Sequence, residues 1–322
     1  EQVTRKAASG RAGGAPELSV VVVSVGGLDH TRRALECLRN QVDPPAFEIL
    51  VAYDPAEVQV ETLEAERPEV RFLAVEDALT DAQKRWSHER HHRMRALAIA
   101  AARGRIVALT EDYARVAPGW TRAIVREHAR HDTGIIGGAI DNGVDRALNW
   151  AVYFADFGRY MSPLPAGPGP FASDVNVSYK RAALEAIAGS LEHGFHEPAV
   201  HDALRARGER IWLSPAIQVI EERSDLSFWP AVRERIVWGR SYAGNLARRM
   251  TPARRLLYTA GSPLLVPLLF LRAARRVFER RCHRAAFLRA APLLFVLLMA
   301  WAAGELLGYA TARPDPFRKR SG

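Results

Sequence analysis

The sequence predicts an α/β fold in which a doubly wound, mainly parallel sheet is followed by hydrophobic helices at the C-terminal end. Three observations lead to this prediction. Short apolar runs alternate with helical patterns through the first third of the 322 residues. Acidic residues follow several of these runs, where the carboxyl ends of parallel strands are expected to meet. Long leucine-rich segments appear near the end of the chain.

Four apolar runs predict the strands of this sheet. They are residues 18–25, 47–52, 70–75 and 106–109. Such unbroken β-branched runs are typical of parallel strands that are buried on both faces. Parallel strands need crossover connections, and helical patterns at 32–40 and 93–103 supply two of them.

Acidic side chains follow two of the predicted strands. Glu111 and Asp112 follow the run 106–109, and Asp54 follows the run 47–52. Carboxylates at this edge of a sheet can hold a divalent cation against a phosphorylated ligand. The alternative is that they cap the next helix or face water. The first turn, residues 24–29, lacks the Gly-x-Gly-x-x-Gly spacing of dinucleotide-binding folds, so a mononucleotide fits better.

Charge is distributed unevenly along the chain. Residues 231–289 contain 14 Arg and 2 acids, a net charge of +12, whereas residues 1–230 contain 27 basic and 32 acidic residues, a net charge of −5. The high isoelectric point therefore reflects a basic surface on the C-terminal part of the chain. Cys37 and Cys282 have no spacing that suggests a metal site or redox pair, which fits a reduced compartment.

Several short motifs follow one another in a definite order along the chain. After the first strand and Asp54 come Met94-Arg95-Ala96, Glu111-Asp112-Tyr113 with Pro118-Gly119-Trp120, the segment 174–181, and His196-Glu197 with Gly208. Together they resemble the motifs of family 2 glycosyltransferases with the GT-A fold. The matching family segments are Ala-Arg-Asn, Asp-x-Asp with a later Pro-Gly-Trp, Asn-x-x-Tyr-Arg-Arg, and a Glu-Asp pair.

This resemblance implies an inverting glycosyltransferase that moves a sugar from a nucleotide-diphosphate sugar to a hydroxyl acceptor, a lipid-linked or cell-surface glycan precursor. Glu197 occupies the position of the catalytic base. Asp54 would bind the base or ribose of the donor, and Arg95 would face its diphosphate. Glu111 and Asp112 would also bind the donor, by holding a divalent cation, Mg²⁺ or Mn²⁺, that stabilises the charge of the leaving group.

Further roles follow from the same resemblance. Asp174, Asn176 and His196 would lie on the acceptor side. Arg240 would be an additional donor contact. Glu221 stands where the family often has a His after the last strand of the sheet. It would replace this His as a further oxygen ligand of the cation, or it is a surface residue.

Two positions besides Glu221 depart from the family pattern. Tyr113 replaces the third acid of the Asp-x-Asp segment, which leaves open how the cation is held and whether one is held at all. Ala96 replaces the Asn of Ala-Arg-Asn. The change at Tyr113 keeps open a catalytically silent homologue that binds sugar nucleotides or acts as a membrane partner. A nucleotidyltransferase on a similar sheet is a further alternative. His88, His91 and His92 resemble a metal cluster, but no further ligand is apparent and nearby arginines repel cations.

The sequence divides into a disordered tail (1–16), a catalytic domain (17–227), a helical linker (228–255), membrane-associated helices (256–312) and a basic tail (313–322). We expect the nucleotide-sugar half at about 17–120 and the acceptor half at about 121–227. Glu1 to Pro16 lack the apolar stretch of a signal peptide.

Two apolar segments, 256–271 and 290–304, are shorter than the roughly 20 residues that span a bilayer. Between them lie seven arginines, which a simple hairpin would carry across the membrane against the positive-inside bias. We therefore expect helices at the cytoplasmic face of the cell membrane, with Arg against an anionic lipid surface. Two tilted spans or core helices of a soluble protein are the alternatives. The basic residues alternate with aliphatic runs instead of aromatic ones, so nucleic acid is not an expected partner.

Overall fold

The computed structural model describes residues 15–76, 89–192 and 194–316. The predicted tails fall largely outside these residues, as does His88. The chain forms two compact units. The first comprises Glu1–Glu76, His91–Gly138 and Pro165–Val219, and the second comprises Asp77–Arg90, Ala139–Leu164 and Ile220–Gly322.

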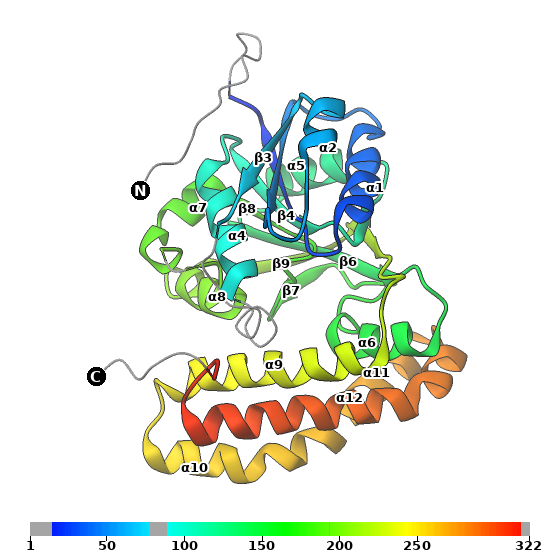
Figure 1. Cartoon of the computed structure of the whole chain (residues 1–322), viewed down its shortest axis with the longest axis vertical. Helices are drawn as coiled ribbons and strands as arrows, with labels where there is room; N and C mark the ends of the chain where they lie inside the picture. The colour runs from blue at the N-terminus through cyan, green and yellow to red at the C-terminus, as the bar shows by residue number, and fades with distance from the viewer. Residues whose placement is uncertain (1–14, 77–88, 193, 317–322) are drawn as a thin grey trace. The chain divides into compact units, whose positions relative to one another are not determined.

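Four parallel strands form the N-terminal half of the sheet in the order β3-β2-β1-β4 (Figure 1). They are β1 (Leu18–Val23), β2 (Phe47–Tyr53), β3 (Val70–Ala74) and β4 (Ile106–Glu111). All four predicted strands are therefore confirmed. β4 extends two residues further than expected, because Thr110 and Glu111 continue the pairing with β1.

Helices connect these strands. They are α1 (Leu28–Arg39), α2 (Glu61–Glu66) and α4 (Glu89–Ala101). α1 buries the predicted stripe of Ala34, Leu35 and Leu38. The chain moves from β1 to β2 to β3 in one direction along the sheet and then returns to β4 on the other side of β1. Because such crossovers are right-handed, α1 and α4 cover opposite faces of the sheet.

The remaining strands complete the sheet beyond β4. They are β5 (Ala114–Val116), β6 (Ile135–Asn142), β7 (Gly167–Gly169), β8 (Val177–Lys180) and β9 (Ile211–Glu221). β8 lies antiparallel to both β4 and β6, and β7 lies antiparallel to β9. Nine strands of the described part of the chain thus form one sheet, and the predicted α/β fold class is confirmed.

Further helices of the first unit are α5 (Trp120–Arg130), α7 (Arg181–Glu185) and α8 (Glu197–Arg205), with a short 3₁₀ turn at Ala188–Ser190. α8 packs on the sheet through a buried polar contact. His201 Nε2 lies 2.9 Å from the hydroxyl of Tyr179, and both side chains are fully buried. This contact joins α8 to β8.

The second unit is mainly helical. Its helices are α6 (Ala147–Asp156), α9 (Phe228–Ala247), α10 (Pro252–Gly261), α11 (Leu265–Arg280) and α12 (Arg284–Thr311). α9 lies within the predicted helical linker 228–255, and the predicted apolar segment 290–304 lies within α12. The segment 256–271 is divided between α10 and α11 by a 3₁₀ turn at Ser262–Leu264, where Pro263 cannot continue the helical hydrogen bonding.

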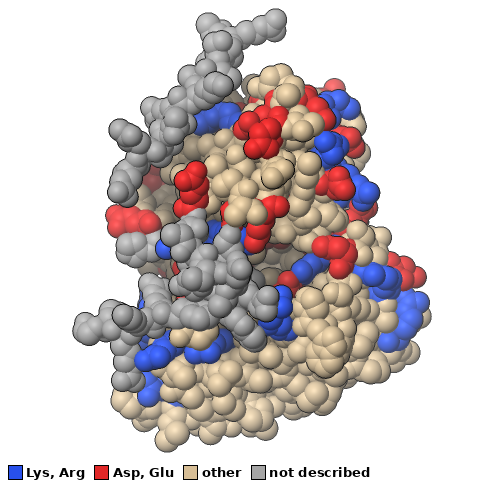
Figure 2. Space-filling view, viewed as in Figure 1, with Lys and Arg blue, Asp and Glu red and all other residues tan. Residues whose placement is uncertain are grey.

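Glycines allow α9 and α12 to lie side by side (Figure 1). A Cβ on Gly304 would come within 2.3 Å of the Ile236 carbonyl oxygen, and a Cβ on Gly239 would come within 2.4 Å of the Trp301 carbonyl oxygen. Small residues are thus required on both helices for this close approach. On the face drawn in Figure 2, the helical unit presents a broad surface of uncharged side chains with basic residues at its margins.

The burial of His201 predicts a pH effect on stability. Burial, followed by the charge of Arg205, lowers the pKa of His201 to about 4. The unfolded chain therefore binds a proton that the folded chain excludes, so this contribution to stability is lost as pH falls from about 6.5 towards 4. In urea denaturation, the stability advantage of wild type over His201→Gln should shrink by roughly 2 kcal/mol between pH 7 and 4.5. Parallel pH curves for the two proteins would contradict this assignment.

Candidate active site

The carboxyl ends of β1, β2 and β4 lie level with one another. Val23 at the end of β1 is opposite both Ala52 of β2 and Glu111 of β4. Asp54 follows Ala52 by two residues, so the predicted site residues Asp54 and Glu111 share this edge of the sheet. Ligands of open α/β sheets bind at this edge.

A buried arginine joins carboxylates from separate segments at this edge. Arg95 comes from α4 and is only 4% exposed. Its Nη2 donates to Oε1 of Glu111 at the end of β4 and lies 2.9 Å from Oδ2 of Asp174, which precedes β8. Burial opposes the charge of Arg95, but Asp174, Glu111 and Glu197 outweigh this effect and raise its pKa. The guanidinium is therefore a permanent positive charge.

Glu197 joins this group through Asp174. The backbone N–H of Asp174 donates to Oε2 of Glu197 across 3.0 Å. Glu197 is half-buried and is the first residue of α8, where the helix N-terminus favours a negative charge. The structure thus brings together four of the predicted site residues. We call Arg95, Glu111, Asp174 and Glu197 the Arg95 cluster.

A pair of histidines fixes the segment that precedes Glu197. The rings of His92 and His196 lie 4.1 Å apart between centroids, at 41°. His92 Nδ1 lies 2.7 Å from the Phe195 carbonyl oxygen. Burial, followed by the charges of His196 and Arg95, lowers the pKa of His92 well below its usual value. The ring is therefore neutral at neutral pH, and Nδ1–H is the group that donates to Phe195.

Gly194 lets the chain approach α4 closely at this point. Its φ of +128° favours glycine, and a Cβ there would come within 3.0 Å of the His92 Cβ. The sequence interpretation considered His92 only as a metal ligand. Its position three residues before Arg95, on the same helix face, is the signal that could have placed it beside the site.

Asp112 lies on the other side of the sheet from Glu111. Adjacent residues of an extended strand point to opposite faces. Glu111 is in register with Val23, which packs with Met94 and Ala98 of α4. Asp112 consequently points toward the turn between β1 and α1.

The carboxylate of Asp112 stabilises this turn by hydrogen bonds. Its Oδ1 accepts hydrogen bonds from the backbone N–H groups of Val25 and Gly26, both at 3.1 Å. Its Oδ2 accepts from the hydroxyls of Ser24 at 3.3 Å and Thr31 at 3.2 Å. Burial raises the pKa of Asp112 to about 6, although these hydrogen bonds lower it. This placement differs from the expected cation ligand, because both oxygens are already used within the protein.

Tyr113 occupies the position of the missing third acid. Its ring meets His30 edge-on, with centroids 4.6 Å apart, and a Cβ on Gly26 would come within 2.7 Å of the ring. The side chain of Glu111 therefore lies on the α4 side of the sheet, whereas those of Asp112 and Tyr113 both lie at the turn between β1 and α1. Over the described ranges, no group of three His, Cys, Asp or Glu side chains is placed to hold a metal ion. Asp112, whose two carboxylate oxygens are both bonded within the protein, thus does not fit the expected role of a cation ligand in this arrangement.

Two other predicted residues are buried in the first unit. Asn176 is 1% exposed; its Oδ1 accepts from Trp120 Nε1 at 2.9 Å and its Nδ2 donates to the Ile217 carbonyl at 3.1 Å. Asn176 thus joins α5 to β9. Asp54 accepts a hydrogen bond from the Ala56 N–H at 2.8 Å and shapes the turn after β2.

Glu221 and Arg240 belong to the second unit. Glu221 ends β9 and is buried. Arg240 lies in α9, where its Nε is 3.4 Å from the Arg313 carbonyl oxygen. Burial lowers its pKa, and Asp315 partly compensates. The cation role of Glu221 and the donor role of Arg240 stay predictions.

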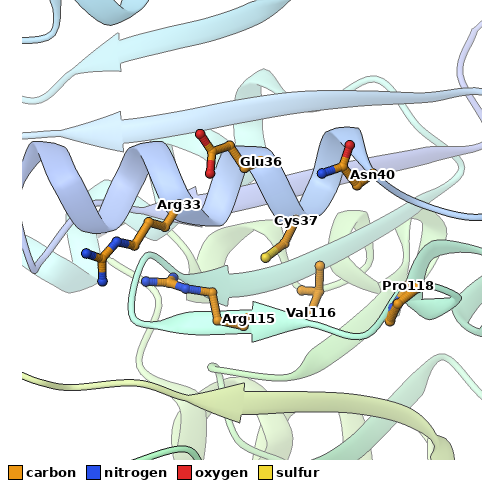
Figure 3. Close-up of a pocket in the computed structure, with 7 residues that line it drawn as sticks. All are labelled: Arg33, Glu36, Cys37, Asn40, Arg115, Val116 and Pro118. Carbon is orange, nitrogen blue, oxygen red and sulfur yellow. The ribbon is translucent and has the colours of Figure 1, made fainter.

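A pocket of about 360 Å³ lies between α1 and the segment that contains β5 (Figure 3). Its lining residues are Arg33, Glu36, Cys37, Asn40, Arg115, Val116 and Pro118. Figure 3 shows the side chains of Arg33 and Arg115 directed toward the same end of the pocket. The pocket shares no residue with the Arg95 cluster.

Comparison with solved structures identifies the type of fold. A mannosyltransferase from Pyrobaculum calidifontis, PcManGT, in complex with GDP-Man and Mn²⁺, is similar with a TM-score of 0.53 and 16% identity, over 91% of this chain and 87% of that one. TarS 1–349 of S. aureus, in complex with UDP, has a TM-score of 0.46 and 11% identity, over 88% of this chain and 91% of that one. The chain matches no protein-family model and no curated protein. The first likeness shows a glycosyltransferase fold.

The hydrogen bonds of Asp112 predict its effect on stability. Asp112→Ala should lower the free energy of unfolding by about 2–4 kcal/mol, because buried N–H groups of Val25 and Gly26 lose their acceptor. Asp112→Asn keeps one side-chain oxygen that can accept from the two N–H groups, so it should lower the free energy of unfolding by only about 1 kcal/mol. Denaturant unfolding measures both values, with the exposed Asp29→Ala of the same region as control. A stable Asp112→Ala protein would show that the turn does not depend on this carboxylate.

Proposed function

We propose that the chain is a glycosyltransferase that moves a sugar from a nucleotide-diphosphate sugar to a hydroxyl acceptor, with inversion at the anomeric carbon. The observation that carries the proposal is the Arg95 cluster at the carboxyl edge of a glycosyltransferase fold. Segments far apart in the sequence converge there. Perturbed and converging charges of this kind are typical of active sites.

The donor would bind along the parallel half of the sheet. Asp54 follows β2 at the edge where nucleotides bind in open α/β folds, which supports its proposed contact with the base or ribose. Glu111 lies at the end of β4 on the side of α4. The sugar would then lie between this edge and Glu197. PcManGT, the similar structure, was solved with a donor of this class, GDP-Man.

Glu197 is the proposed base. Its carboxylate would accept the proton of the acceptor hydroxyl, whose oxygen then forms a bond to the anomeric carbon. The bond from that carbon to the diphosphate breaks on the opposite side, and the nucleoside diphosphate leaves. The Asp174 N–H bond at 3.0 Å fixes the orientation of the carboxylate, and His196 and Asp174 would border the acceptor. We assign no step to a divalent cation, because Asp112 and Tyr113 are engaged elsewhere.

The second unit supports a membrane-associated enzyme. Two helical stretches, Pro252–Arg280 of 29 residues and Arg284–Thr311 of 28 residues, are long and apolar enough to cross a membrane by length and composition. Five leucines on them are 64–71% exposed: Leu256, Leu257, Leu264, Leu271 and Leu288. Apolar surface of this extent usually marks an interaction site. Exposed arginines near it, such as Arg254 and Arg272, suit an anionic lipid surface.

Some arginines of this region have a role within the protein instead. Arg280 donates to the carbonyl oxygens of Met161 and Arg159, and Arg289 pairs with Asp145. The C-terminal end of α11 is thereby held to the loop after α6. We propose that α10 to α12 lie in the interface of the cytoplasmic leaflet, so that an acceptor that is a lipid-linked or cell-surface glycan precursor reaches the enzyme from the membrane.

The proposed base gives a direct test of function. A panel of UDP-, GDP- and dTDP-sugars should include a donor from which the protein releases nucleoside diphosphate. Glu197→Gln should reduce this turnover by about 10²–10⁴-fold, because no group then accepts the proton. The control is Asp202→Asn, an exposed acid on the same helix, which should stay near wild type.

Other outcomes of this assay separate the alternatives. Release of pyrophosphate would indicate a nucleotidyltransferase. Donor binding without turnover would indicate a catalytically silent homologue. Full activity of Glu197→Gln would refute its role as the base.

Membrane association has its own test. In sedimentation with vesicles, the wild-type protein should bind anionic vesicles more strongly than neutral ones, and added salt should weaken this preference. The triple variant Leu256→Ser, Leu257→Ser, Leu264→Ser should lose roughly 10²-fold in binding, since each leucine contributes about 1 kcal/mol or more when buried. Val42→Ser, at a single exposed apolar position of the first unit, is the control. Equal binding by the triple variant would contradict the proposal.

A further inference from the structure

The position of Arg95 differs from that of a residue that faces the donor diphosphate. The guanidinium is 4% exposed, and its Nη2 already binds Glu111 and Asp174. Its Nη1 lies 3.4 Å from the carbonyl oxygen of His91 on its own helix. A diphosphate would reach Arg95 only if these carboxylates moved.

The local charge also opposes a direct contact. Three carboxylates surround one guanidinium, so the formal charge of the Arg95 cluster is −2. A diphosphate carries negative charge of its own and would be repelled at close range. Arg95 is consequently better placed to pair with the carboxylates than to bind the donor.

The contacts continue from Arg95 to the proposed base. Arg95 holds the Asp174 side chain at 2.9 Å, and the backbone N–H of Asp174 holds Glu197 at 3.0 Å. Arg95 also interacts electrostatically with Glu197, because Glu197 is among the charges that raise the pKa of Arg95. Such an interaction is reciprocal: the positive charge favours the ionised carboxylate by the same free energy.

We propose that Arg95 is a positioning residue for the base, which orients Glu197 through Asp174 and keeps it ionised, and that it does not bind the donor. This inference rests on the proposed function and adds a role that the sequence motifs did not predict. A base must be deprotonated before it accepts the acceptor proton. Arg95 therefore sets the pH below which transfer stops.

The titratable groups that face Arg95 determine how sugar transfer would depend on pH. Glu111 comes from β4, Asp174 from the segment before β8, and Glu197 from α8; His91 and His92 lie on its own helix, and His196 stacks on His92. Among these, Glu197 is the group that reacts. Removal of the positive charge is expected to move its titration upward by about one pH unit or more.

The test measures this titration directly. Carboxyl ¹³C NMR of the full-length protein follows Glu197 in wild type, Arg95→Gln and Arg95→Lys, with Glu197→Gln to assign the signal. We expect the midpoint to rise by about one pH unit in Arg95→Gln and to stay near wild type in Arg95→Lys, which keeps the charge. An unchanged midpoint in Arg95→Gln would overturn the inference.

Kinetics provide the second measurement. Arg95→Gln should lower kcat by about 10²-fold and move the acid limb of its pH profile upward, while KM for the sugar nucleotide stays within about 3-fold. Arg105→Gln, an exposed arginine that pairs with Glu17, is the control. A raised donor KM with unchanged kcat would show that Arg95 contacts the donor and would overturn the inference.

Two further measurements distinguish misfolding of Arg95→Gln from failure of the inference, and failure of the inference from failure of the proposed function. If Arg95→Gln does not fold, Asp174→Asn replaces it, because this change keeps the backbone donor to Glu197 and weakens the pairing with Arg95. Because Asp174→Asn also removes a negative charge beside Glu197, which by itself lowers the Glu197 midpoint, the readout for this variant is kcat: a fall of about 10-fold at an unchanged donor KM is expected, and an unchanged kcat would overturn the inference. If the wild-type protein turns over no sugar nucleotide, the proposed function fails, while the NMR titration still decides whether Arg95 controls Glu197.

Discussion

The burial of one positive charge organises the site of this protein. Arg95 leaves water almost completely, and a buried guanidinium is tolerated only where carboxylates and hydrogen bonds compensate its lost hydration. Glu111 and Asp174 supply that compensation from segments that α4 reaches only in the folded chain. The end of β4, the segment before β8 and the start of α8 are therefore held in one place by one side chain.

A second buried charge stabilises the opposite face of the sheet. Asp112 accepts hydrogen bonds from the turn between β1 and α1, and Tyr113 covers Gly26 in the same turn. The edge of the sheet is thus fastened on both sides, by Arg95 toward α4 and by Asp112 toward α1. A chemistry that depends on a carboxylate such as Glu197 benefits from this rigidity, because a misplacement of about 1 Å can reduce a rate by 10²-fold.

Much of the fold could be predicted from the sequence. The four parallel strands, the stripe of α1 and the apolar C-terminal helices follow from hydrophobic periodicity, and the structure confirms them. The antiparallel half was harder to predict, because its strands pair over long sequence separations and three of them, β5, β7 and β8, have only three or four residues. The segment 256–271 is divided at Pro263. Its apolar composition suggested one continuous stretch, and no weight was given to the proline.

The site was only partly predictable, for a physical reason. The motif order located Arg95, Glu111, Asp174 and Glu197, which the structure brings together. The same order suggested that Glu111 and Asp112 act as a pair, although strand alternation sends adjacent side chains to opposite faces. The buried contacts of Asn176 likewise depend on α5 and β9, which no local pattern connects to it.

A crystal structure of the protein with a bound nucleotide-diphosphate sugar, grown in the presence of a chelator, would show where the donor lies. We expect the sugar at the carboxyl edge of β4 beside Glu197, with Arg95 still on Glu111 and Asp174, and Asp112 still in the turn after β1. A donor bound elsewhere on the molecule, or a diphosphate in direct contact with Arg95, would contradict this expectation.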